Sequence, residues 1–356
     1  MRDPRIEKLA DVLINHSTRI KPKETVLIAS TELGQPLVEV LYQKVLALGA
    51  FPLLKLTFST LQPLYFKNAA NEQLDTLLEI EELIYKKADV LINVRAPGNM
   101  KELSSVDPDR MTRRMKTMQP IQEWVISGNL RWTLCNYPTQ ALAQEAEMSL
   151  DEYEDFVFGA TNIDWSAQAE FLKNIKDVFD QGEKVHLVGK NTDLKFNLAG
   201  RSGIVCDGSH NMPDGEVFYA PVDDSAEGYI NYDFPAIYQG REVNNVRLEF
   251  KKGQVVKASA DKNEALLQKV IETDEGAKRI GEFGIGTNYG ITKFTKDILF
   301  DEKIGGTIHL ALGRAYPEGG GINQSAVHWD MVKDLRSSGK IYLDGKLVQE
   351  NGEFKI

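Results

Sequence analysis

The sequence predicts an α/β N-terminal domain with a parallel, helix-covered sheet, followed by an α+β, strand-rich C-terminal domain. The chain of 356 residues exceeds the length at which a single hydrophobic core usually stops growing, so we expect two domains. In the first half, short β-rich segments alternate with helical patterns, which is typical of a parallel sheet. In the second half, short strands of alternating polarity are separated by turn residues.

The N-terminal domain is expected to span residues 1–182 and to begin with an amphipathic helix at residues 1–15. Its other elements follow from apolar runs and helical periodicity. The predicted strands are 24–30, 51–57, 89–94 and 131–136, and the predicted helices are 36–48, 74–87, 111–126, 149–158 and 167–180. Gly182 marks the predicted boundary between the domains.

The C-terminal domain is expected to span residues 183–356. Its predicted strands are 184–188, 193–198, 203–206, 216–219, 228–232, 242–250 and 255–260, and one helix is predicted near 263–273. Glycine becomes dense further on, because residues 281–321 contain 10 of the 28 glycines of the chain. Backbone that is so rich in glycine is usually shaped around another group.

Composition and missing motifs exclude several functions. The 42 Lys and Arg residues against 52 Asp and Glu give a net charge of −10, which argues against a nucleic-acid-binding protein. The most apolar window, residues 45–54, is too short to cross a membrane, and the N-terminus lacks a signal-peptide pattern. Cys135 and Cys206 form no C-x-x-C pair and fit a reducing compartment, so we expect a cytoplasmic protein. The N-terminal domain has no glycine-rich dinucleotide fingerprint and no P-loop.

Two histidines lie in the glycine-rich region. His328 and Asp330 are two residues apart, so on an extended strand they point to the same face, about 7 Å apart. This spacing suits metal ligation and suits a structural hydrogen-bonded pair equally well. His309 is the strong polar residue on one face of the apolar segment 306–313, where a buried histidine needs a hydrogen-bond partner or a metal ion. Tyr316, taken by itself, is more typical of a packed aromatic residue.

Two carboxylates complete a candidate metal site. Glu216 opens a predicted strand after a dense turn, and Glu282 lies in an apolar, glycine-rich stretch. Neither is placed like a solvated surface charge. Carboxylates and histidines in this number suit two divalent ions about 3.5–4 Å apart, an arrangement that activates water for hydrolysis.

Four segments together resemble one known family. They are N-M-P-D-G-E-V-F-Y-A-P at 211–221, G-E-F-G-I-G-T-N at 281–288, L-F-D-E-K at 299–303 leading into H-L-A-L-G-R-A-Y-P at 309–317, and H-W-D at 328–330. In order and residue type they are similar to the thermophilic-type metallo-aminopeptidase family. The resemblance is strong in the second half of the chain and extends to the first half only in its α/β texture.

The resemblance implies a metallo-exopeptidase that hydrolyses the N-terminal residue from peptides with a free N-terminus. It also implies a cytosolic homodimer and two divalent ions. Mixed nitrogen and oxygen ligands suit zinc, cobalt or manganese without selecting among them. A dinuclear cation site would stabilise the phenolate of a tyrosine ligand. The metal ligands carried over from the family pattern are Glu216, Glu282, His309, Tyr316, His328 and Asp330.

Two further residues are candidates for the chemistry. A proton shuttle is needed between the water and the leaving amine, and Glu302 is the candidate because it lies close to the predicted ligand strand. Arg314 lies between His309 and Tyr316, where it is a candidate to stabilise the oxyanion or to neutralise site carboxylates. The connection from Tyr316 to His328 is compact where many family members have a longer insertion, so the substrate pocket is expected to differ.

Two other functions stay open on the residues alone. Another dinuclear metal hydrolase, acting on a phosphoester or a different amide, would use the same metal chemistry together with basic groups. A basic run at residues 110–116 suits that function, but it also suits a solvated helix face. A non-catalytic small-molecule-binding protein would not need His309, His328 and Asp330 in the glycine-rich segment.

Overall fold

The computed structural model describes residues 3–356, which form two compact units. The first unit comprises the residues up to Asn162 together with Gly208–Pro213. The second unit comprises Ile163–Asp207 and Asp214–Ile356.

Helix α9 (Trp165–Phe179) falls in the second of these units. The sequence analysis placed the boundary at Gly182, after this helix, whereas the contacts divide the chain before it. The physical reason is that Leu172, Ile175 and Phe179 on its apolar face join the core of the second unit.

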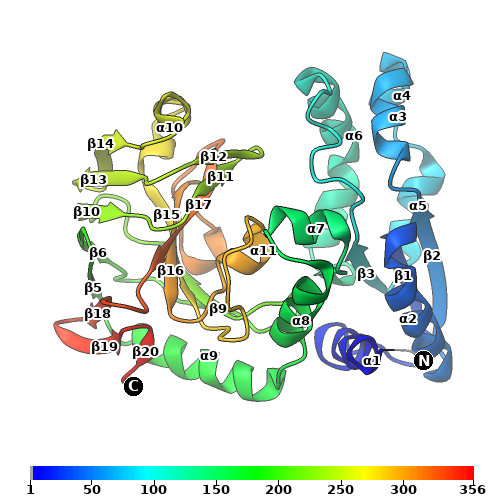
Figure 1. Cartoon of the computed structure of the whole chain (residues 1–356), viewed down its shortest axis with the longest axis horizontal. Coiled ribbons are helices and arrows are strands. Elements are labelled where there is room, and N and C mark those ends of the chain that lie inside the picture. The colour runs from blue at the N-terminus through cyan, green and yellow to red at the C-terminus, as the bar shows by residue number, and fades with distance from the viewer. Residues whose placement is uncertain (1–2) are drawn as a thin grey trace. The chain divides into compact units, whose positions relative to one another are not determined.

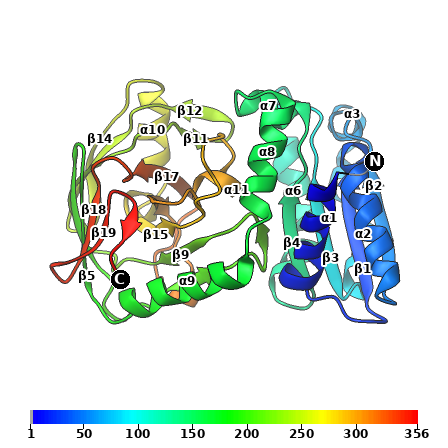
Figure 2. The same ribbon diagram turned by 60° about the horizontal axis from the view of Figure 1, so that its bottom comes forward.

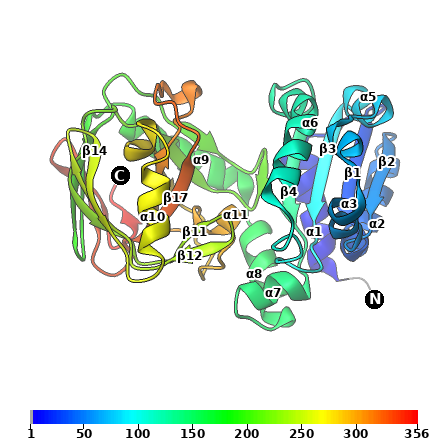
Figure 3. The ribbon, with the colours of Figure 1, turned by 90° about the horizontal axis from the view of Figure 1, so that it is seen from above.

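The first unit contains a five-stranded sheet in the order β2-β1-β3-β4-β8, in which all neighbours are parallel. This confirms the predicted parallel sheet. Figure 1 shows β1, β2 and β3 of this sheet. Its strands are β1 (Thr25–Thr31), β2 (Phe51–Thr57), β3 (Val90–Arg95), β4 (Arg131–Asn136) and β8 (Asn211–Met212). Figure 3 shows β1, β3 and β4 side by side. The short strand β8 comes from the second half of the sequence and was not predicted.

Helices cover both faces of this sheet. The helices of the first unit are α1 (Pro4–Asp11), α2 (Gln35–Ala47), α3 (Leu61–Asn68), α4 (Asn71–Asp75), α5 (Glu79–Lys87), α6 (Pro108–Ile126), α7 (Gln140–Glu145) and α8 (Leu150–Thr161). On one face, Leu27 and Leu91 pack against Tyr85 of α5 and Trp124 of α6. On the other face, α2 lies beside Leu54 of β2. None of the helices in residues 3–356 has both the length and the apolar character that crossing a bilayer requires.

Local capping explains where two predicted helices differ from the observed ones. The predicted helix at 74–87 is divided, because the Thr76 hydroxyl donates to the carbonyl of Glu72 and ends α4 before α5 begins among acidic residues. Helix α6 begins three residues earlier than predicted. Its N-cap residue, Asp107, accepts a hydrogen bond from the backbone of Asp109, and Pro108 occupies the first helical position.

The second unit consists mainly of antiparallel sheets, which confirms the strand-rich prediction. An eight-stranded sheet has the order β14-β13-β10-β6-β5-β18-β19-β20, and a five-stranded sheet has the order β17-β16-β15-β9-β7. Strands β11 (Ala236–Tyr238) and β12 (Arg241–Val243) form a separate pair.

The eight-stranded sheet is built from β5 (Lys184–Gly189), β6 (Thr192–Asn197), β10 (Glu227–Asn231), β13 (Arg247–Lys251), β14 (Gln254–Ser259), β18 (Lys340–Leu343), β19 (Lys346–Glu350) and β20 (Glu353–Phe354). The five-stranded sheet is built from β7 (Ile204–Cys206), β9 (Glu216–Tyr219), β15 (Ile280–Gly286), β16 (Thr307–Gly313) and β17 (His328–Asp334). The helices of this unit, besides α9, are α10 (Glu264–Ile271) and α11 (Ile298–Asp301).

An apolar core with an aromatic centre holds the second unit together. Phe283 of β15 is fully buried, and its ring lies 5.0 Å from that of Phe196 and 6.3 Å from that of Phe179. Helix α9 runs alongside β9 and β7 (Figure 2). Asp180, just after this helix, accepts hydrogen bonds at 2.9 Å from both the Tyr219 hydroxyl and the Gly203 backbone. Packing and a polar anchor therefore both attach α9 to the five-stranded sheet.

We expect Phe283→Ala to lower the free energy of unfolding by about 3–5 kcal/mol, because it opens a cavity in this core. Phe58→Ala is the matched control, since that ring is 65% exposed. It should cost no more than about 0.5 kcal/mol. Urea unfolding followed by fluorescence and circular dichroism measures both, and equal losses would contradict the assigned core.

Asp180 should make the free energy of unfolding depend on pH in the acid range. Burial alone raises its pKa, but Lys176, Gly203 and Tyr219 outweigh burial and lower the pKa below the ordinary value. A carboxyl group whose pKa is lower in the folded state stabilises the fold above its unfolded pKa, and that contribution disappears as the pH falls through the folded pKa.

Asp180→Asn should therefore cost about 1–3 kcal/mol at pH 7 and markedly less at pH 3, as measured by urea unfolding at both values. Asp177→Asn is the control, because its carboxylate is half exposed and pairs with Lys173 on the same helix. A cost of Asp180→Asn that does not change with pH would show that the carboxylate charge is not what matters.

Candidate metal centre

One face of the five-stranded sheet carries five of the residues predicted to bind metal. Cross-strand partners share a face of a sheet, and residues two apart on a strand do as well. Strand β15 pairs Glu282 with Ala311 of β16, which in turn pairs with Asp330 of β17. His309, two residues before Ala311, and His328, two residues before Asp330, therefore lie on this face.

Glu216 joins the same face from β9, because it pairs with Gly286, which is two residues from Gly284 and four from Glu282. The pairing register thus gathers residues that are up to 114 positions apart in the sequence, from Glu216 to Asp330. Four strands contribute to the cluster, and the pairing of β15 with β16 shifts register between Ile280 and Glu282, directly at one of the site carboxylates.

Gly284 leaves the space that the His309 ring fills. The two residues are direct cross-strand partners. A Cβ atom added to Gly284 would lie only 1.9 Å from Cε1 of His309. The imidazole therefore lies across strand β15 in the place of a missing side chain, which explains one glycine of the dense region predicted to be shaped around another group.

The imidazoles and carboxylates converge within 4 Å. His309 Nε2 lies 3.2 Å from Glu282 Oε1 and 3.5 Å from Glu216 Oε2. His328 Nε2 lies 3.6 Å from Glu282 Oε2 and 3.5 Å from Asp330 Oδ2. The two oxygens of Glu282 thus face different histidines.

Two groups of donor atoms result from this arrangement. Within each group the ligand atoms lie within 4.8 Å of one another. One group contains Glu282, His328 and Asp330, and the other contains Glu216, Glu302 and His309. Glu282 also contacts His309 of the second group, so it connects the two.

Backbone carbonyls orient both histidines. Nδ1 of His309 lies 3.0 Å from the carbonyl oxygen of Glu302, and Nδ1 of His328 lies 2.8 Å from that of Arg314. A carbonyl only accepts hydrogen bonds, so Nδ1 of each ring donates, and Nε2 is the atom that remains for the carboxylates or a metal ion. Metal-binding histidines are typically held in this way.

The cluster buries more negative than positive charge. Glu216 and Glu282 are each 5% exposed and His309 is fully buried. Burial raises the pKa values of Glu216 and Asp330 above the ordinary range. Burial also lowers the pKa of His309, but the hydrogen bond to Glu282 and the charge of Glu216 outweigh this and raise it to about 10. In the absence of a metal ion, the site carboxylates therefore favour the protonated form of His309.

Unpartnered oxygens indicate that the donor set suits metal ions. Glu216 Oε2 and Asp330 Oδ1 are shielded from solvent and, within residues 3–356, accept no hydrogen bond. Buried carboxylate oxygens in this state are costly unless a cation faces them. Carboxylate oxygens and imidazole nitrogens are the ligands that divalent ions such as zinc and manganese bind.

Tyr316 lies beside this cluster. Its ring is 5.3 Å from that of His328 and 5.6 Å from that of Phe218. Burial, followed by the charges of Glu282 and Asp330, raises the pKa of Tyr316 to about 12. The phenol therefore stays protonated at neutral pH unless a cation stabilises its ionised form.

The buried side chain of Asn323 anchors the compact connection between Tyr316 and His328 to the neighbouring backbone. The Asn323 side-chain amide donates to the carbonyls of Gly276 and Gly313, at 2.8 and 2.6 Å. Gly313 has a φ of +103°, so the chain can turn there between His309 and Tyr316.

Glu302 and Arg314, the candidates for proton transfer and for stabilising the oxyanion, lie in different surroundings. The side chain of Glu302 is 17% exposed, belongs to the group with Glu216 and His309, and pairs with Lys303. Arg314 is exposed. Among residues 3–356 its guanidinium makes no hydrogen bond or ion pair to a site carboxylate, and its backbone carbonyl accepts the hydrogen bond from His328 Nδ1.

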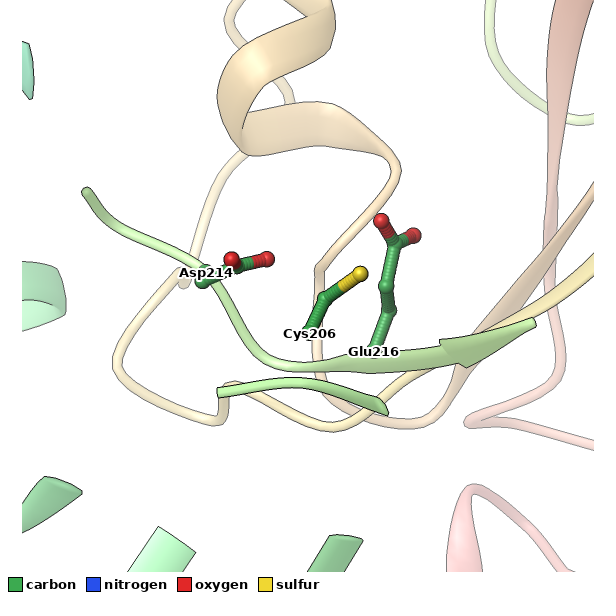
Figure 4. Close-up of side chains that lie close together, drawn as sticks. All are labelled: Cys206, Asp214 and Glu216. Carbon is green, nitrogen blue, oxygen red and sulfur yellow. The ribbon is translucent and has the colours of Figure 1, made fainter. Parts of the chain in front are cut away.

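Three neighbours of the cluster were not among the predicted metal ligands, namely Cys206, Asp214 and Lys303. Cys206 and Asp214 form a third group of donor atoms with Glu216, also within 4.8 Å of one another (Figure 4). Lys303 has no exposed side-chain surface, and its Nζ lies 3.5 Å from Glu216 Oε1. Lys303 was quoted within the motif at 299–303, but nothing in a single sequence distinguishes a buried lysine from a solvated one.

We expect Gly284→Ala to displace the His309 ring, because the new methyl group would overlap it. The variant should lose about 1–3 kcal/mol of stability and bind cobalt at least about tenfold more weakly than the wild type, as measured by urea unfolding and titration calorimetry.

Gly159→Ala is the matched control, since this exposed glycine of helix α8 has no atom within 4 Å of an added Cβ. It should raise stability by about 0.5–1 kcal/mol and leave cobalt binding unchanged. Wild-type cobalt affinity in Gly284→Ala would show that the position of His309 does not govern binding.

Comparisons with known proteins agree with this site. A solved structure described as wild-type AmpT from Thermus thermophilus superimposes with a TM-score of 0.83 and 24% identity, covering 99% of both chains, which establishes the fold. Aminopeptidase 2 of Geobacillus stearothermophilus is 27% identical over 396 residues, covering 96% of this chain and 95% of that protein. Aminopeptidase PepS of Streptococcus thermophilus is 25% identical over 410 residues, covering 99% and 98% respectively.

The model of one protein family extends over almost the whole chain. It is described as thermophilic metalloprotease (M29), and it matches residues 2–354. The buried carboxylate and histidine cluster on the five-stranded sheet is the kind of site that a metalloprotease needs. The chain therefore belongs to the thermophilic metalloprotease (M29) family.

Proposed function

We propose that this protein is an aminopeptidase that hydrolyses the N-terminal residue from peptides and depends on two divalent metal ions. The observation that carries the proposal is Glu282, whose two oxygens face His309 and His328 within a buried, negatively charged cluster. Membership of the M29 family and the aminopeptidase names of the relatives support the same activity.

We assign six residues as metal ligands, in two groups. Glu216 and His309 belong to one group, Asp330 and His328 to the other, and Glu282 lies between them. Tyr316 is the sixth, supported by its position beside His328. Mixed nitrogen and oxygen ligands suit zinc, cobalt and manganese alike.

The metal ions, when bound, supply a Lewis acid for the scissile carbonyl and a water of lowered pKa. The residues of the chain orient the reaction and move protons around this chemistry. Glu302 is the proposed proton shuttle, because its carboxylate lies near Glu216 and His309 and is partly exposed. A group in this position can accept a proton from water and donate it to the leaving amine.

Arg314 contributes positive charge next to the proposed ligand Tyr316. Its charge lowers the pKa of Tyr316, opposing the larger effect of burial, and thus favours the ionised phenol. We propose that it also neutralises site carboxylates or stabilises the oxyanion. The negative cluster itself favours a substrate with a positive α-amino group over a phosphate.

Two properties beyond the reaction are proposed as well. A homodimer is supported by the exposed apolar side chains of the terminal strand β2, namely Phe51, Leu53, Leu54 and Leu56, since such an edge favours association. A cytoplasmic location is supported by the two cysteines, Cys135 and Cys206, which are both unpaired.

The alternative functions are less well supported. In the basic run of α6, Arg113 pairs with Asp75 and Arg114 pairs with Glu81, so these charges are used within the first unit. A non-catalytic binding protein would have no need for unpartnered carboxylate oxygens buried beside two histidines.

Activity should require both the metal ions and His328. Aminoacyl reporter substrates should be cleaved by the wild type, and a chelator should abolish cleavage until zinc, cobalt or manganese is restored. His328→Ala should lower kcat/KM at least about 100-fold, because a metal ligand is lost.

N-acetylated reporter substrates are the control, since an aminopeptidase needs a free amine and should leave them intact. His186→Ala is the matched control variant, because that histidine pairs with Asp193 in the eight-stranded sheet. Full activity in the presence of the chelator, or in His328→Ala, would refute a metal-dependent mechanism at this site.

A further inference from the structure

Lys303 is a fully buried lysine to which the proposed ligand set assigns no role. It lies between helix α11 and strand β16. Its backbone N–H donates to the carbonyl of Phe300, and its carbonyl accepts from the N–H of Asn288, both at 3.0 Å. Both ends of this backbone segment are thus held in place. Its side chain ends among carboxylates, where it pairs with Glu302 and lies 3.5 Å from Glu216 Oε1.

The Cys206–Asp214–Glu216 group contains donor types that bind cations. Figure 4 shows the three side chains on neighbouring segments, with the sulfur and the carboxylates on the same side of strand β9. Nζ of Lys303 lies 3.5 Å from Glu216 Oε1, and the same ammonium pairs with Glu302. The ammonium of Lys303 is therefore the cation that meets this group, at Glu216.

The two oxygens of Glu216 have different surroundings. Oε1 lies near the ammonium of Lys303, whereas Oε2 lies 3.5 Å from His309 Nε2. Oε2 is also shielded from solvent and accepts no hydrogen bond from the described residues. One oxygen of Glu216 is thus paired with the Lys303 ammonium, whereas the other faces His309.

We propose that Lys303 is a positioning residue, which holds Glu216 Oε1 and thereby presents Glu216 Oε2 alone as the ligand atom beside His309. The inference rests on the proposed metal-dependent function. It also assigns the Cys206–Asp214–Glu216 group to the ammonium of Lys303 and not to a third metal ion. A lysine suits this task because its compact charge on a flexible stem donates to several carboxylates at once.

Loss of Lys303 is expected to weaken metal binding. Without Lys303, the carboxylates of Glu216, Glu302 and Asp214 lose their fixed partner and repel one another. Glu216 would then be free to turn away from His309. Groups that orient a metal ligand typically affect metal affinity by about 10–100-fold when they are removed.

Lys303→Met tests the proposal, because it keeps the length of the side chain and removes its charge. Lys333→Met is the matched control. Lys333 is also fully buried, with its Nζ 2.8 Å from Asp233 and 3.1 Å from the carbonyl of Lys190. Lys333 lies five residues after His328 and three after Asp330 on strand β17. Because these separations are odd, its side chain points to the opposite face of the sheet.

Cobalt binding is the measurement, by titration calorimetry, elemental analysis after dialysis and visible absorption, with melting temperatures taken in parallel. The wild type and Lys333→Met should bind two ions with the same affinity, even if Lys333→Met melts earlier. Lys303→Met should bind one of the two ions at least about tenfold more weakly, with a changed cobalt absorption spectrum. Unchanged binding and an unchanged spectrum in Lys303→Met would overturn the proposal.

A second variant distinguishes positioning of Glu216 from the balance of charge. Because it keeps the net charge of the site, it also serves if the uncompensated Lys303→Met variant does not fold. Lys303→Met combined with Asp214→Asn removes one charge of each sign. Weakened binding in this double variant supports positioning of Glu216, whereas wild-type binding would show that only net charge matters and would refute it.

The wild-type cobalt protein distinguishes the remaining outcomes. We expect no cobalt–thiolate charge-transfer absorption in the near ultraviolet, and its presence would overturn the assignment of Cys206 to the group that Lys303 faces. A wild type that binds no divalent ion would refute the proposed function itself. A wild type that binds two ions, with Lys303→Met identical to it, would refute the role of Lys303 alone.

Discussion

Negative charge buried on one face of a sheet is the constraint on which the rest of the site depends. Glu216, Glu282 and Asp330 project from three strands into a region that water screens poorly. Such carboxylates must either become neutral or acquire cations. The chain meets part of this demand itself, through the ammonium of Lys303 and the proton on His309. The demand that remains is what makes the cluster suitable for divalent ions.

The backbone provides the space and the hydrogen-bond acceptors that orient the two histidines of the cluster. Gly284 makes room for the His309 ring, and the carbonyls of Glu302 and Arg314 determine which nitrogen of each histidine faces the carboxylates. Glu302 and Arg314 are therefore connected to the site through their main chain as well as through any role of their side chains. Rigid strands and fixed carbonyls together position the donor atoms before any ion binds, which lowers the cost of ordering them.

The fold is shared at low sequence identity because an apolar core tolerates more substitutions than a cluster of metal ligands does. The superposition on the Thermus thermophilus structure covers 99% of both chains at 24% identity. An apolar core such as that around Phe283 needs side chains of suitable size and polarity, and many combinations meet that need. The candidate metal centre is less permissive, because binding a metal ion there would need particular donor atoms at particular register positions.

The sequence by itself determined the features that local chemistry dictates. Periodicity predicted the parallel and antiparallel regions, and spacing placed His328 and Asp330 on one face. Local sequence made His309, Glu216 and Glu282 candidates, whereas Tyr316 became one only through the family motifs. Only the tertiary structure decided the pairing of Glu282 with both histidines, the placement of α9 in the second unit, and the burial of Lys303 beside Glu216. The physical reason is that strand register and burial depend on contacts between residues far apart in the chain, about which local pattern carries no information.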